Sequence, residues 1–319
     1  MLAMAARRKS MSISRPEVSV VIVSYNDEHL LRRLFDSLER QRFVKFEVLV
    51  VDNASNPTVR ALSDIEGARY FRNRNTGYTG GNNLGVTYAH GDLILILNSD
   101  TWLESEAIMS LVNFFQTVEE GCMVLAPKIM IRDTDLINSV GMMRFHRRAN
   151  LYSNIGYLER DIGQYDEPRE IQAFDGAAFM FRKRLMDETY LFNPAFFAGS
   201  DSTDLAERVR KLGYSVWTCP QAVVHHELHA TYRDSPLNVR PRLVRNNLAH
   251  TLTNLGMGSL IITCLTLLHF CIVRVRRRDF FTAKHYLTGL MHFVRDFGTL
   301  VCSARSMAEN VKSSSHRRS

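Results

Sequence analysis

Residues 92–101 read Asp-Leu-Ile-Leu-Ile-Leu-Asn-Ser-Asp-Thr, and this stretch decides the fold class. The unbroken apolar run at 93–97 predicts a central strand that is covered on both faces. Asn98, Ser99 and Asp100 follow where this strand ends, and ligands of open α/β sheets lie at the carboxyl ends of strands. A carboxylate there can hold a divalent cation and, through it, a diphosphate. Asp100 can equally cap the helix that follows.

Three upstream segments extend this pattern. Apolar runs at 18–24 and 46–51 predict two more strands, and each ends in small polar residues. Residues 29–41 between them carry leucines on one side and charged residues on the other, which predicts an amphipathic helix. Residues 75–85 predict a loop rich in glycine and asparagine before a short helix, without the glycine spacing of a dinucleotide-binding fingerprint. The chain therefore opens as an α/β domain.

Composition and cysteine usage narrow the class of protein. The chain has 319 residues, 45% of them hydrophobic, which is enough for one large domain and an appendage. Its five cysteines are scattered and never spaced Cys-x-x-Cys, which argues against a disulfide framework or a structural zinc site. We therefore expect a reducing location that faces the cytosol.

The positive charge is concentrated at the C-terminal end. From Arg274 onward the chain holds ten basic and three acidic residues, and the resulting +7 equals the net charge of the whole chain. Residues 1–273 are therefore formally neutral, so we expect no nucleic acid as a partner of the sheet domain. The basic tail instead favours contact with an anionic membrane surface.

The C-terminal region has two apolar segments. Residues 246–273 contain no formally charged residue, and 255–273 are mostly apolar, which approaches the ~20 residues that span a bilayer. Residues 280–301 repeat apolar side chains at helical spacing, as an interfacial amphipathic helix does. Three interpretations stay open: a pair of helices lying on the membrane, a spanning first helix, or an element that covers the core or forms a homo-oligomer.

Motifs spread over residues 17–250 carry a family resemblance. They are Val-Ser-Tyr-Asn at 23–26, Val-Asp-Asn-Ala-Ser at 51–55, the 75–85 segment, Leu-Asn-Ser-Asp-Thr at 97–101, Phe-Asp-Gly-Ala-Ala at 174–178, Asp-Ser-Thr-Asp-Leu at 201–205, Arg-Lys-Leu-Gly-Tyr at 210–214 and Pro-Gln-Ala-Val-Val-His-His at 220–226. In order and separation they resemble the family 2 glycosyltransferases of GT-A fold, in the branch of rhamnosyl- and galactofuranosyltransferases.

The resemblance implies a fold and a division of the chain. The fold is GT-A, a Rossmann-like mixed sheet flanked by helices, followed by C-terminal amphipathic membrane-associated helices. We expect a flexible basic segment at 1–16, the glycosyltransferase domain at 17–253, a helical membrane-associated region at 254–312 and a disordered tail at 313–319. Residues 138–169 are rich in glycine, tyrosine and aspartate, and this composition predicts a mobile flap over the sugar.

The resemblance also implies how a nucleoside-diphosphate sugar is bound. Asp52 would read the pyrimidine ring, although Asp-Asn at a strand end is also ordinary turn chemistry. The residues implied to contact the nucleotide-sugar are Ser24, Tyr25, Asp52, Asn75, Gly77, Asn83 and Asp100.

A departing diphosphate needs a counter-charge, and no Walker-type lysine is present, so we expect a metal. Asp100 is the first ligand, and Asn98 stands where the family usually has a second Asp. The resemblance implies His226 as a further ligand, with His225 as the alternative. Oxygen ligands with one imidazole suit Mn²⁺ or Mg²⁺.

The general base is the point at which this chain departs from the family. The family's base position is occupied by Ser202, whose hydroxyl cannot act as a base near neutral pH without an activator. Asp201 and Asp204 are therefore the catalytic candidates, with Asp201 as the base and Asp204 holding the loop. Both acids can also be explained as caps of the helix that follows.

The expected function is inverting, metal-dependent transfer of a sugar, rhamnose or galactofuranose, to a glycan or lipid-linked acceptor of cell-surface polysaccharide at the cytoplasmic face of the membrane. The alternative is a catalytically silent relative that binds nucleotide-sugar and acts as a scaffold, and Ser202 is its support.

Overall fold

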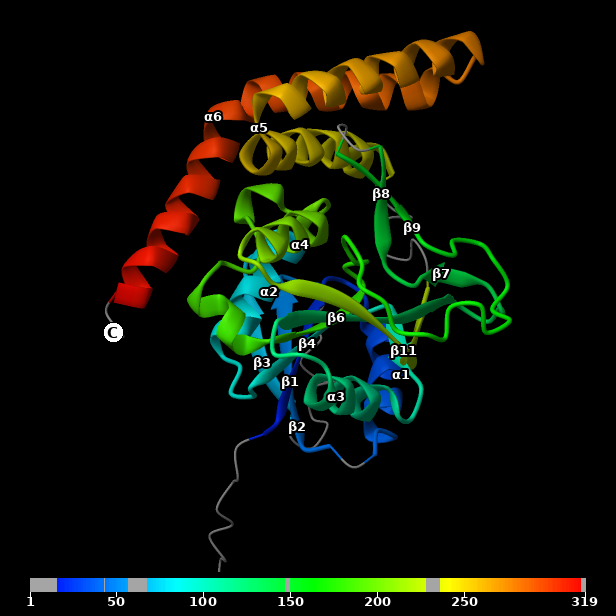
Figure 1. The fold of residues 1–319 in the computed structure, drawn as a ribbon, viewed down its shortest axis with the longest axis vertical. Coiled ribbons are helices and arrows are strands. Elements are labelled where there is room, and N and C mark those ends of the chain that lie inside the picture. Colours follow the sequence, from blue (N-terminus) through cyan, green and yellow to red (C-terminus); the bar gives the residue numbers. More distant parts are fainter. Residues whose placement is uncertain (1–15, 43, 57–67, 147–149, 228–235, 317–319) are drawn as a thin grey trace, which may run out of the picture.

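The computed structural model describes residues 16–42, 44–56, 68–146, 150–227 and 236–316 (Figure 1). Within these residues, nine strands form one mixed sheet in the order β3-β2-β1-β4-β10-β6-β11-β5, and β7 pairs with β6. The strands are β1 (Val18–Ser24), β2 (Phe46–Asn53), β3 (Ala68–Asn73), β4 (Leu93–Asn98), β5 (Thr101–Leu103), β6 (Cys122–Ile131), β7 (Ile137–Ser139), β10 (Ala178–Arg182) and β11 (Ser215–His226). A separate hairpin joins β8 (Met142–His146) to β9 (Leu151–Asn154).

Helices cover both faces of the sheet. Successive side chains of a strand point to opposite faces, and the apolar strands therefore present apolar side chains on both. The face of β1 that holds Val20 and Ile22 packs on α1 and α3, and the face that holds Val21 packs on α2 and α4. These helices are α1 (Glu28–Glu39), α2 (Gly77–Thr87), α3 (Ala107–Thr117) and α4 (Asp201–Lys211). The apolar residues of β4 are buried throughout, as its sequence predicts. The predicted Rossmann-like mixed sheet flanked by helices is confirmed.

Helix α2 begins earlier than the sequence predicts. The sequence predicts a loop over 75–85, whereas the structure is helical from Gly77 onward. The reason is packing, because a Cβ on Gly81 would lie 2.7 Å from Val23 Cγ1 and a Cβ on Gly85 would lie 2.4 Å from Val21 Cγ1. These glycines let the helix lie directly on β1 and are not signs of a loop.

Two long helices form a further layer on the α4 side. Helix α5 (Pro236–Arg276) is interrupted at Gly256, where φ is 82°, and α6 (Phe280–His316) follows. The first half of α5 lies over α4, and the second half of α5 and the first part of α6 lie farther out (Figure 1). The rest of α6 runs back beside the domain, where Ser303 donates a hydrogen bond to Asn193. The break lies close to the predicted boundary at 253/254. Helix α6 continues into the predicted tail at 313–319, whose last three residues lie outside the described residues, as do residues 1–15 of the predicted flexible segment.

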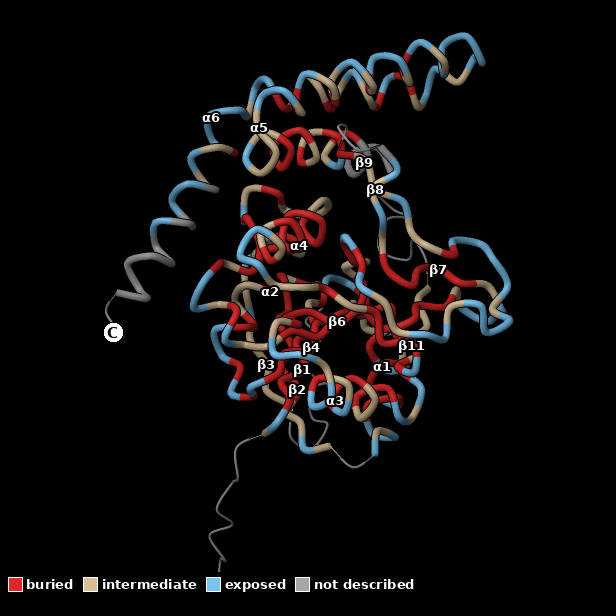
Figure 2. The backbone as a smooth tube through the Cα atoms, in the orientation of Figure 1, coloured by how far each residue is buried: buried red, intermediate tan, exposed pale blue. Residues whose placement is uncertain are grey.

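The uncharged run at 246–273 is divided by this break. Asn246, His250 and Thr251 are fully buried on the domain side of α5, so the absence of charge there reflects packing on the protein. The second half of α5 and the helix α6 expose more residues than the first half of α5 does (Figure 2). By length and composition alone, the helix Pro241–Arg276 is the one segment of the described chain that could cross a membrane.

Candidate active site

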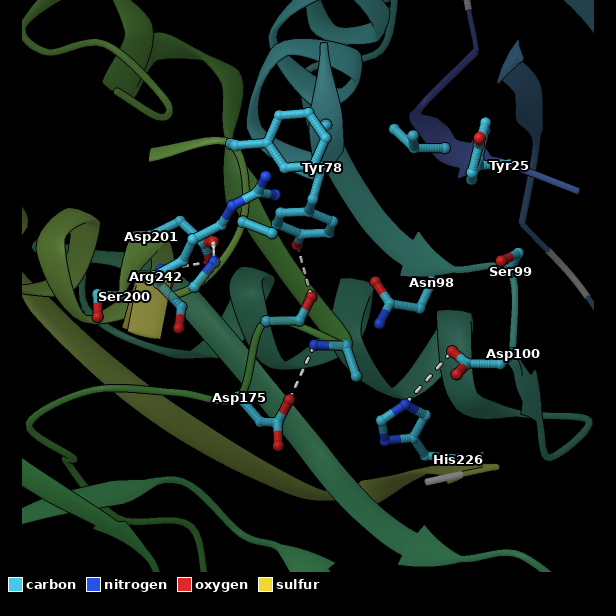
Figure 3. Close-up of a pocket in the computed structure, with 18 of the residues that line it drawn as sticks. Tyr25, Tyr78, Asn98, Ser99, Asp100, Asp175, Ser200, Asp201, His226 and Arg242 are labelled. Carbon is cyan, nitrogen blue, oxygen red and sulfur yellow. Dashed lines mark hydrogen bonds and ion pairs between the residues drawn. The ribbon is translucent and has the colours of Figure 1, made fainter. Parts of the chain in front are cut away.

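A cavity of about 720 Å³ opens at the carboxyl ends of β1 and β4. Its walls come from segments far apart in the sequence, including the start of α2, the turn after β4, the end of β11, the loop before α4 and the first turns of α5 (Figure 3). The predicted site residues that line it are Tyr25, Asn75, Gly77, Asp100, Asp201 and His226. Ser24, Asp52, Asn83 and Asp204 are not among the lining residues.

Strand pairing brings Asp100 and His226 together. Strands β5 and β11 are antiparallel and place His226 opposite Thr101, the residue after Asp100. The Nε2 atom of His226 lies 3.3 Å from Oδ1 of Asp100 (Figure 3). His225 is not among the cavity-lining residues, and its Nε2 lies 2.8 Å from Glu104 Oε1. The cavity therefore favours His226 over His225.

The atoms around Asp100 fit a divalent cation. Asp100 Oδ1 is buried and has no hydrogen-bond partner within the described chain, and the ring nitrogen of His226 that faces it is Nε2. Asn98 lines the same cavity and carries a carbonyl oxygen. The described residues hold no cluster of three His, Cys, Asp or Glu side chains that would bind an ion unaided. Two or three protein ligands leave positions for phosphate and water, which is how Mg²⁺ is usually held beside a substrate phosphate.

Asp201 lies on the other side of the cavity from Asp100 (Figure 3). It is the first residue of α4 and is 5% exposed. Its Oδ2 accepts a hydrogen bond from Gly199 N at 2.6 Å, and its Oδ1 accepts one from Ser202 N at 2.8 Å. Burial raises the pKa of Asp201 to about 6 in spite of these hydrogen bonds. A carboxyl that titrates near neutral pH is suited to accept a proton from a hydroxyl.

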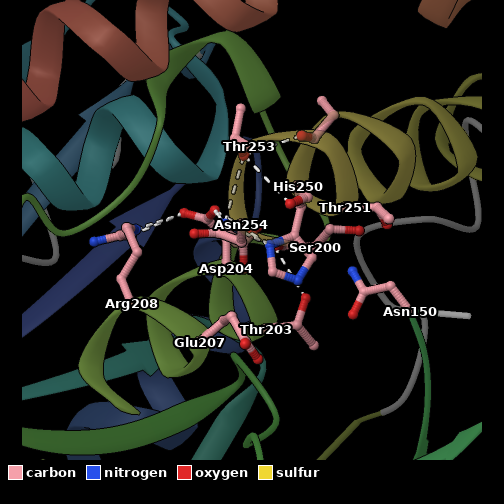
Figure 4. A network of polar contacts seen from close by, with 12 residues as sticks. Asn150, Ser200, Thr203, Asp204, Glu207, Arg208, His250, Thr251, Thr253 and Asn254 are labelled. Atoms are coloured by element: carbon pink, nitrogen blue, oxygen red, sulfur yellow. Dashed lines mark hydrogen bonds and ion pairs between the residues drawn. The ribbon is translucent and has the colours of Figure 1, made fainter. Parts of the chain in front are cut away.

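Asp204 points away from the cavity into the contact between α4 and α5 (Figure 4). Its Oδ2 forms an ion pair with Arg208 at 2.9 Å, and its Oδ1 accepts a hydrogen bond from Asn254 Nδ2 at 2.7 Å and lies 3.3 Å from His250 Nδ1. Burial alone would raise the pKa of Asp204, but Arg208 and His250 outweigh it and hold the pKa below its ordinary value. These contacts support a structural role for Asp204 as the residue that holds the loop, and a catalytic role for it stays a prediction.

The loop that precedes Asp201 is fixed by α5. The side-chain amide of Asn246 donates to three carbonyl oxygens of residues 196–199, at 2.9, 3.0 and 2.8 Å. Gly199 has a φ of 92°, and a Cβ there would lie 2.2 Å from Leu243 Cδ2. The loop can approach α5 this closely only with glycine at that position.

Asn83 does not line the cavity, so its predicted contact with the nucleotide-sugar stays a prediction. It lies on α2, where its Nδ2 donates to Phe192 O at 2.8 Å and its Oδ1 accepts from Phe192 N at 3.0 Å. The helix in place of the expected loop is the reason, because it turns this amide toward the segment before α4. Asn75 does line the cavity, and its Oδ1 accepts from Gly77 N at 3.0 Å.

Asp52 and Ser24 lie behind the cavity wall. Asp52 is fully buried, and its Oδ1 accepts a hydrogen bond from Ser55 N at 2.8 Å. The Tyr70 hydroxyl and the Arg72 guanidinium donate to its Oδ2. The Ser24 hydroxyl donates to the carboxylate of Asp27. Direct contact of Asp52 with a nucleotide base therefore stays a prediction.

Sequence reasoning missed two carboxylates that line the cavity, Asp27 and Asp175. Burial raises the pKa of Asp27, although the hydroxyls of Ser24 and Ser99 donate to it. Asp175 accepts a hydrogen bond from Asn138 Nδ2 at 3.1 Å. Two features of the sequence could have identified these residues. Asp27 comes just after the end of the predicted strand at 18–24, and Asp175 lies inside the motif at 174–178.

Arg242 was also missed. It reaches the cavity from α5 and belongs to none of the motifs, and its guanidinium carbon lies 4.6 Å from the centre of the Phe197 ring. The predicted flap at 138–169 contributes Asn138, Asn154 and Tyr157 to the lining. The flap contains β8 and β9, so part of it is regular structure.

The model of glycosyl transferase family 2 matches residues 19–189, which is more than half of the chain. The chain belongs to glycosyl transferase family 2. Asp100 lies inside the matched stretch of this family 2 glycosyltransferase, whereas Asp201 and His226 lie beyond it.

Two relatives are similar to this family 2 glycosyltransferase in sequence. The low-salt glycan biosynthesis hexosyltransferase Agl10 of Haloferax volcanii is 24% identical over 208 residues, which cover 64% of this chain and 64% of the relative. The GalNAc(5)-diNAcBac-PP-undecaprenol beta-1,3-glucosyltransferase of Campylobacter jejuni is 26% identical over 198 residues, which cover 59% of this chain and 58% of the relative. The chain therefore spans less than two thirds of the length of either relative.

Two solved structures are similar in fold. GalNAc-T7 with UDP, GalNAc and Mn²⁺ aligns with a TM-score of 0.60 at 17% identity, over 75% of this chain and 48% of that one. The mannosyltransferase PcManGT of Pyrobaculum calidifontis, in complex with GDP-Man and Mn²⁺, aligns with a TM-score of 0.55 at 16% identity, over 89% of this chain and 88% of that one. This family 2 glycosyltransferase has the predicted GT-A fold.

Proposed function

We propose that this protein is an inverting, metal-dependent glycosyltransferase that moves a sugar from a nucleoside-diphosphate sugar to a glycan or lipid-linked acceptor in polysaccharide synthesis. The observation that carries the proposal is that Asp100 with His226 and, on the other side, Asp201 line one cavity of a family 2 domain. The names of the two relatives, a glycan-biosynthesis hexosyltransferase and a glucosyltransferase of an undecaprenol-linked acceptor, support it.

Each side of the cavity would have its own chemical task. Asp100, His226 and the Asn98 carbonyl would hold Mn²⁺ or Mg²⁺, which neutralises the departing diphosphate when bound. Tyr25 also lines the cavity and would contact the nucleotide. Asp201, once ionised, takes the proton from the acceptor hydroxyl while that oxygen attacks the anomeric carbon.

Inversion is supported by the same geometry. The proposed diphosphate ligands and the proposed base lie on opposite sides of the cavity (Figure 3). The acceptor oxygen would therefore approach the anomeric carbon from the face opposite the leaving group. The order of the sequence motifs supports rhamnose or galactofuranose as the transferred sugar.

The C-terminal helices support attachment to the membrane at the cytoplasmic face. Exposed apolar side chains recur at helical spacing along the outer part of α5 and on α6. On α5 they are Met257, Ile261, Leu265, Leu268, Ile272 and Val275, and on α6 they include Phe280, Leu287, Met291 and Val294. Arg274 and the arginines at 276–278 follow the stripe on α5 and suit anionic lipid headgroups.

A second candidate function is nucleotide-sugar binding without catalysis. One observation favours it, because Ser202 lines the cavity at the position where the family places its base. If Ser202→Asp transferred sugar and the native chain did not, this second function would be supported.

The proposed function is tested by thermal unfolding with a panel of nucleotide-sugars, each with and without Mn²⁺. We expect UDP or dTDP sugars to raise the melting temperature only when the metal is present, because ligands that bind the folded state stabilise it. Asp100→Ala should abolish this rise, and Glu104→Ala, which removes an acid that contacts His225 outside the cavity, should retain it. Equal stabilisation of native protein and Asp100→Ala would contradict the proposed metal site.

A further inference from the structure

We infer that Arg242 forms an anion subsite at the acceptor end of the cavity, and that it binds the phosphate of an acceptor carried on a lipid phosphate or diphosphate. The inference rests on the proposed function and adds the chemical class of the acceptor.

The position of Arg242 assigns it to the acceptor and not to the leaving group. Arg242 lines the cavity from α5, and Figure 3 shows it on the side of Asp201, with Asp100 and His226 on the other side. The donor diphosphate must meet the metal ligands, and the acceptor hydroxyl must meet Asp201. An anion bound by Arg242 would therefore belong to the molecule whose hydroxyl reacts.

The charges around the cavity make Arg242 distinctive. Among the described lining residues it is the one arginine, and no lysine lines the cavity, whereas four aspartates do. No carboxylate of the described chain lies within ion-pair distance of Arg242, and its guanidinium faces the Phe197 ring. Contact with an aromatic face leaves the N–H donors in the guanidinium plane free for a ligand. That planar fork matches the oxygens of a phosphate.

The segment of α5 that carries Arg242 is held in place from two sides. Arg245, one turn later, pairs with Asp296 of α6 at 2.9 Å and donates to Ala195 O at 2.8 Å. A Cβ on Gly289 of α6 would lie 2.4 Å from Val244 Cβ, so the two helices are in close contact there. Because the backbone around Arg242 is already ordered, little further ordering is needed when an anion binds.

The same helix connects the cavity to an apolar surface. Beyond the break at Gly256, Ile261 and Leu265 of α5 are 54% and 61% exposed. From its N-terminal end, α5 therefore carries first the Arg242 guanidinium at the cavity and then an exposed apolar surface suited to lipid. An acceptor in which a phosphate joins the sugar to a lipid tail has the same order of groups.

The test uses the full chain in detergent, with saturating UDP and Mn²⁺ to fill the donor side. Farnesyl diphosphate and uncharged farnesol are then titrated, and binding is followed by calorimetry. We expect native protein to prefer the diphosphate by about 10-fold or more, as charge-assisted hydrogen bonds allow. Arg242→Gln should lose this preference and keep its affinity for UDP. Arg40→Gln, which changes an exposed arginine at the end of α1 that does not line the cavity, should keep both.

Three results would overturn the inference. One is an unchanged preference for the diphosphate in Arg242→Gln, and another is no preference in native protein that binds UDP normally. The third is a loss of UDP affinity in Arg242→Gln as large as its loss of farnesyl diphosphate affinity, which would assign the guanidinium to the donor. Failure of native protein to bind UDP with Mn²⁺ would instead contradict the proposed function.

Discussion

Replacing Asp201 by Asn should make the protein more stable and less active at neutral pH. Burial raises the pKa of Asp201 to about 6 from the ordinary 3.8. Between these two pH values the carboxyl is ionised in the unfolded chain and protonated in the fold. The free energy of unfolding therefore falls as pH rises through this window, and it stays lower above it. Two pH units between the two titrations correspond to ~3 kcal/mol.

The Asn side chain avoids this cost because it does not ionise. It also loses one of the two backbone hydrogen bonds that the carboxylate accepts, from Gly199 and Ser202, at a cost of ~1 kcal/mol. The net expectation at pH 7 is that Asp201→Asn raises the free energy of unfolding by ~2 kcal/mol. At pH 4 the gain should vanish, because the native carboxyl is then protonated as well.

Activity should change in the opposite direction. Asp201→Asn cannot take the acceptor proton, so turnover should fall by ~10²-fold or more. Turnover of the native protein should fall about tenfold for each pH unit below 6, because the ionised carboxyl is the base. The assays are sugar transfer and denaturant unfolding of both proteins between pH 4 and pH 8.

Asp204→Asn is the matched control, since Arg208 and His250 stabilise the charge of Asp204. It should lower stability at neutral pH. Native turnover in Asp201→Asn, or a variant that is less stable than native protein at pH 7, would refute this account of Asp201.

Three further predictions concern other parts of the molecule. Asp100→Ala should lower metal-dependent turnover by ~10²-fold or more, and native activity in the presence of a chelator would contradict the metal role. Asn246→Ala removes the amide donor of three carbonyl oxygens, of which Phe196 O keeps the Ala198 N–H as a donor. It should lower the free energy of unfolding by ~2 kcal/mol and reduce turnover while UDP affinity stays unchanged. Leu265→Glu combined with Met291→Glu, at positions 61% and 63% exposed, should release the protein from vesicles of anionic lipid in a sedimentation assay. Persistent sedimentation of this double variant would mean that another surface binds lipid.

The sequence predicted those parts of the fold that depend on local pattern. The apolar runs at 18–24 and 93–97 predicted β1 and β4, and the polar residues after them marked the edge of the sheet at which the cavity opens. The glycines of α2 were misleading because the same residue serves loops and close helix packing, and only the neighbouring strand tells the two apart.

The acceptor side of the site was harder to predict, for a physical reason. Asn246 and Arg242 act on the cavity through the packing of α5 across the loop before α4, and no local pattern encodes such a contact. The contact of Asp204 with His250 of α5 could not be predicted for the same reason.

The contact between Asn246 and the loop before α4 has a consequence for protein engineering. The amide that fixes the loop lies 45 positions downstream of Asp201. A chimera joined between these positions would combine a loop from one parent with a support from another. Crossover points after Gly256 would instead exchange only the outer helices and leave the catalytic loop with its native partner.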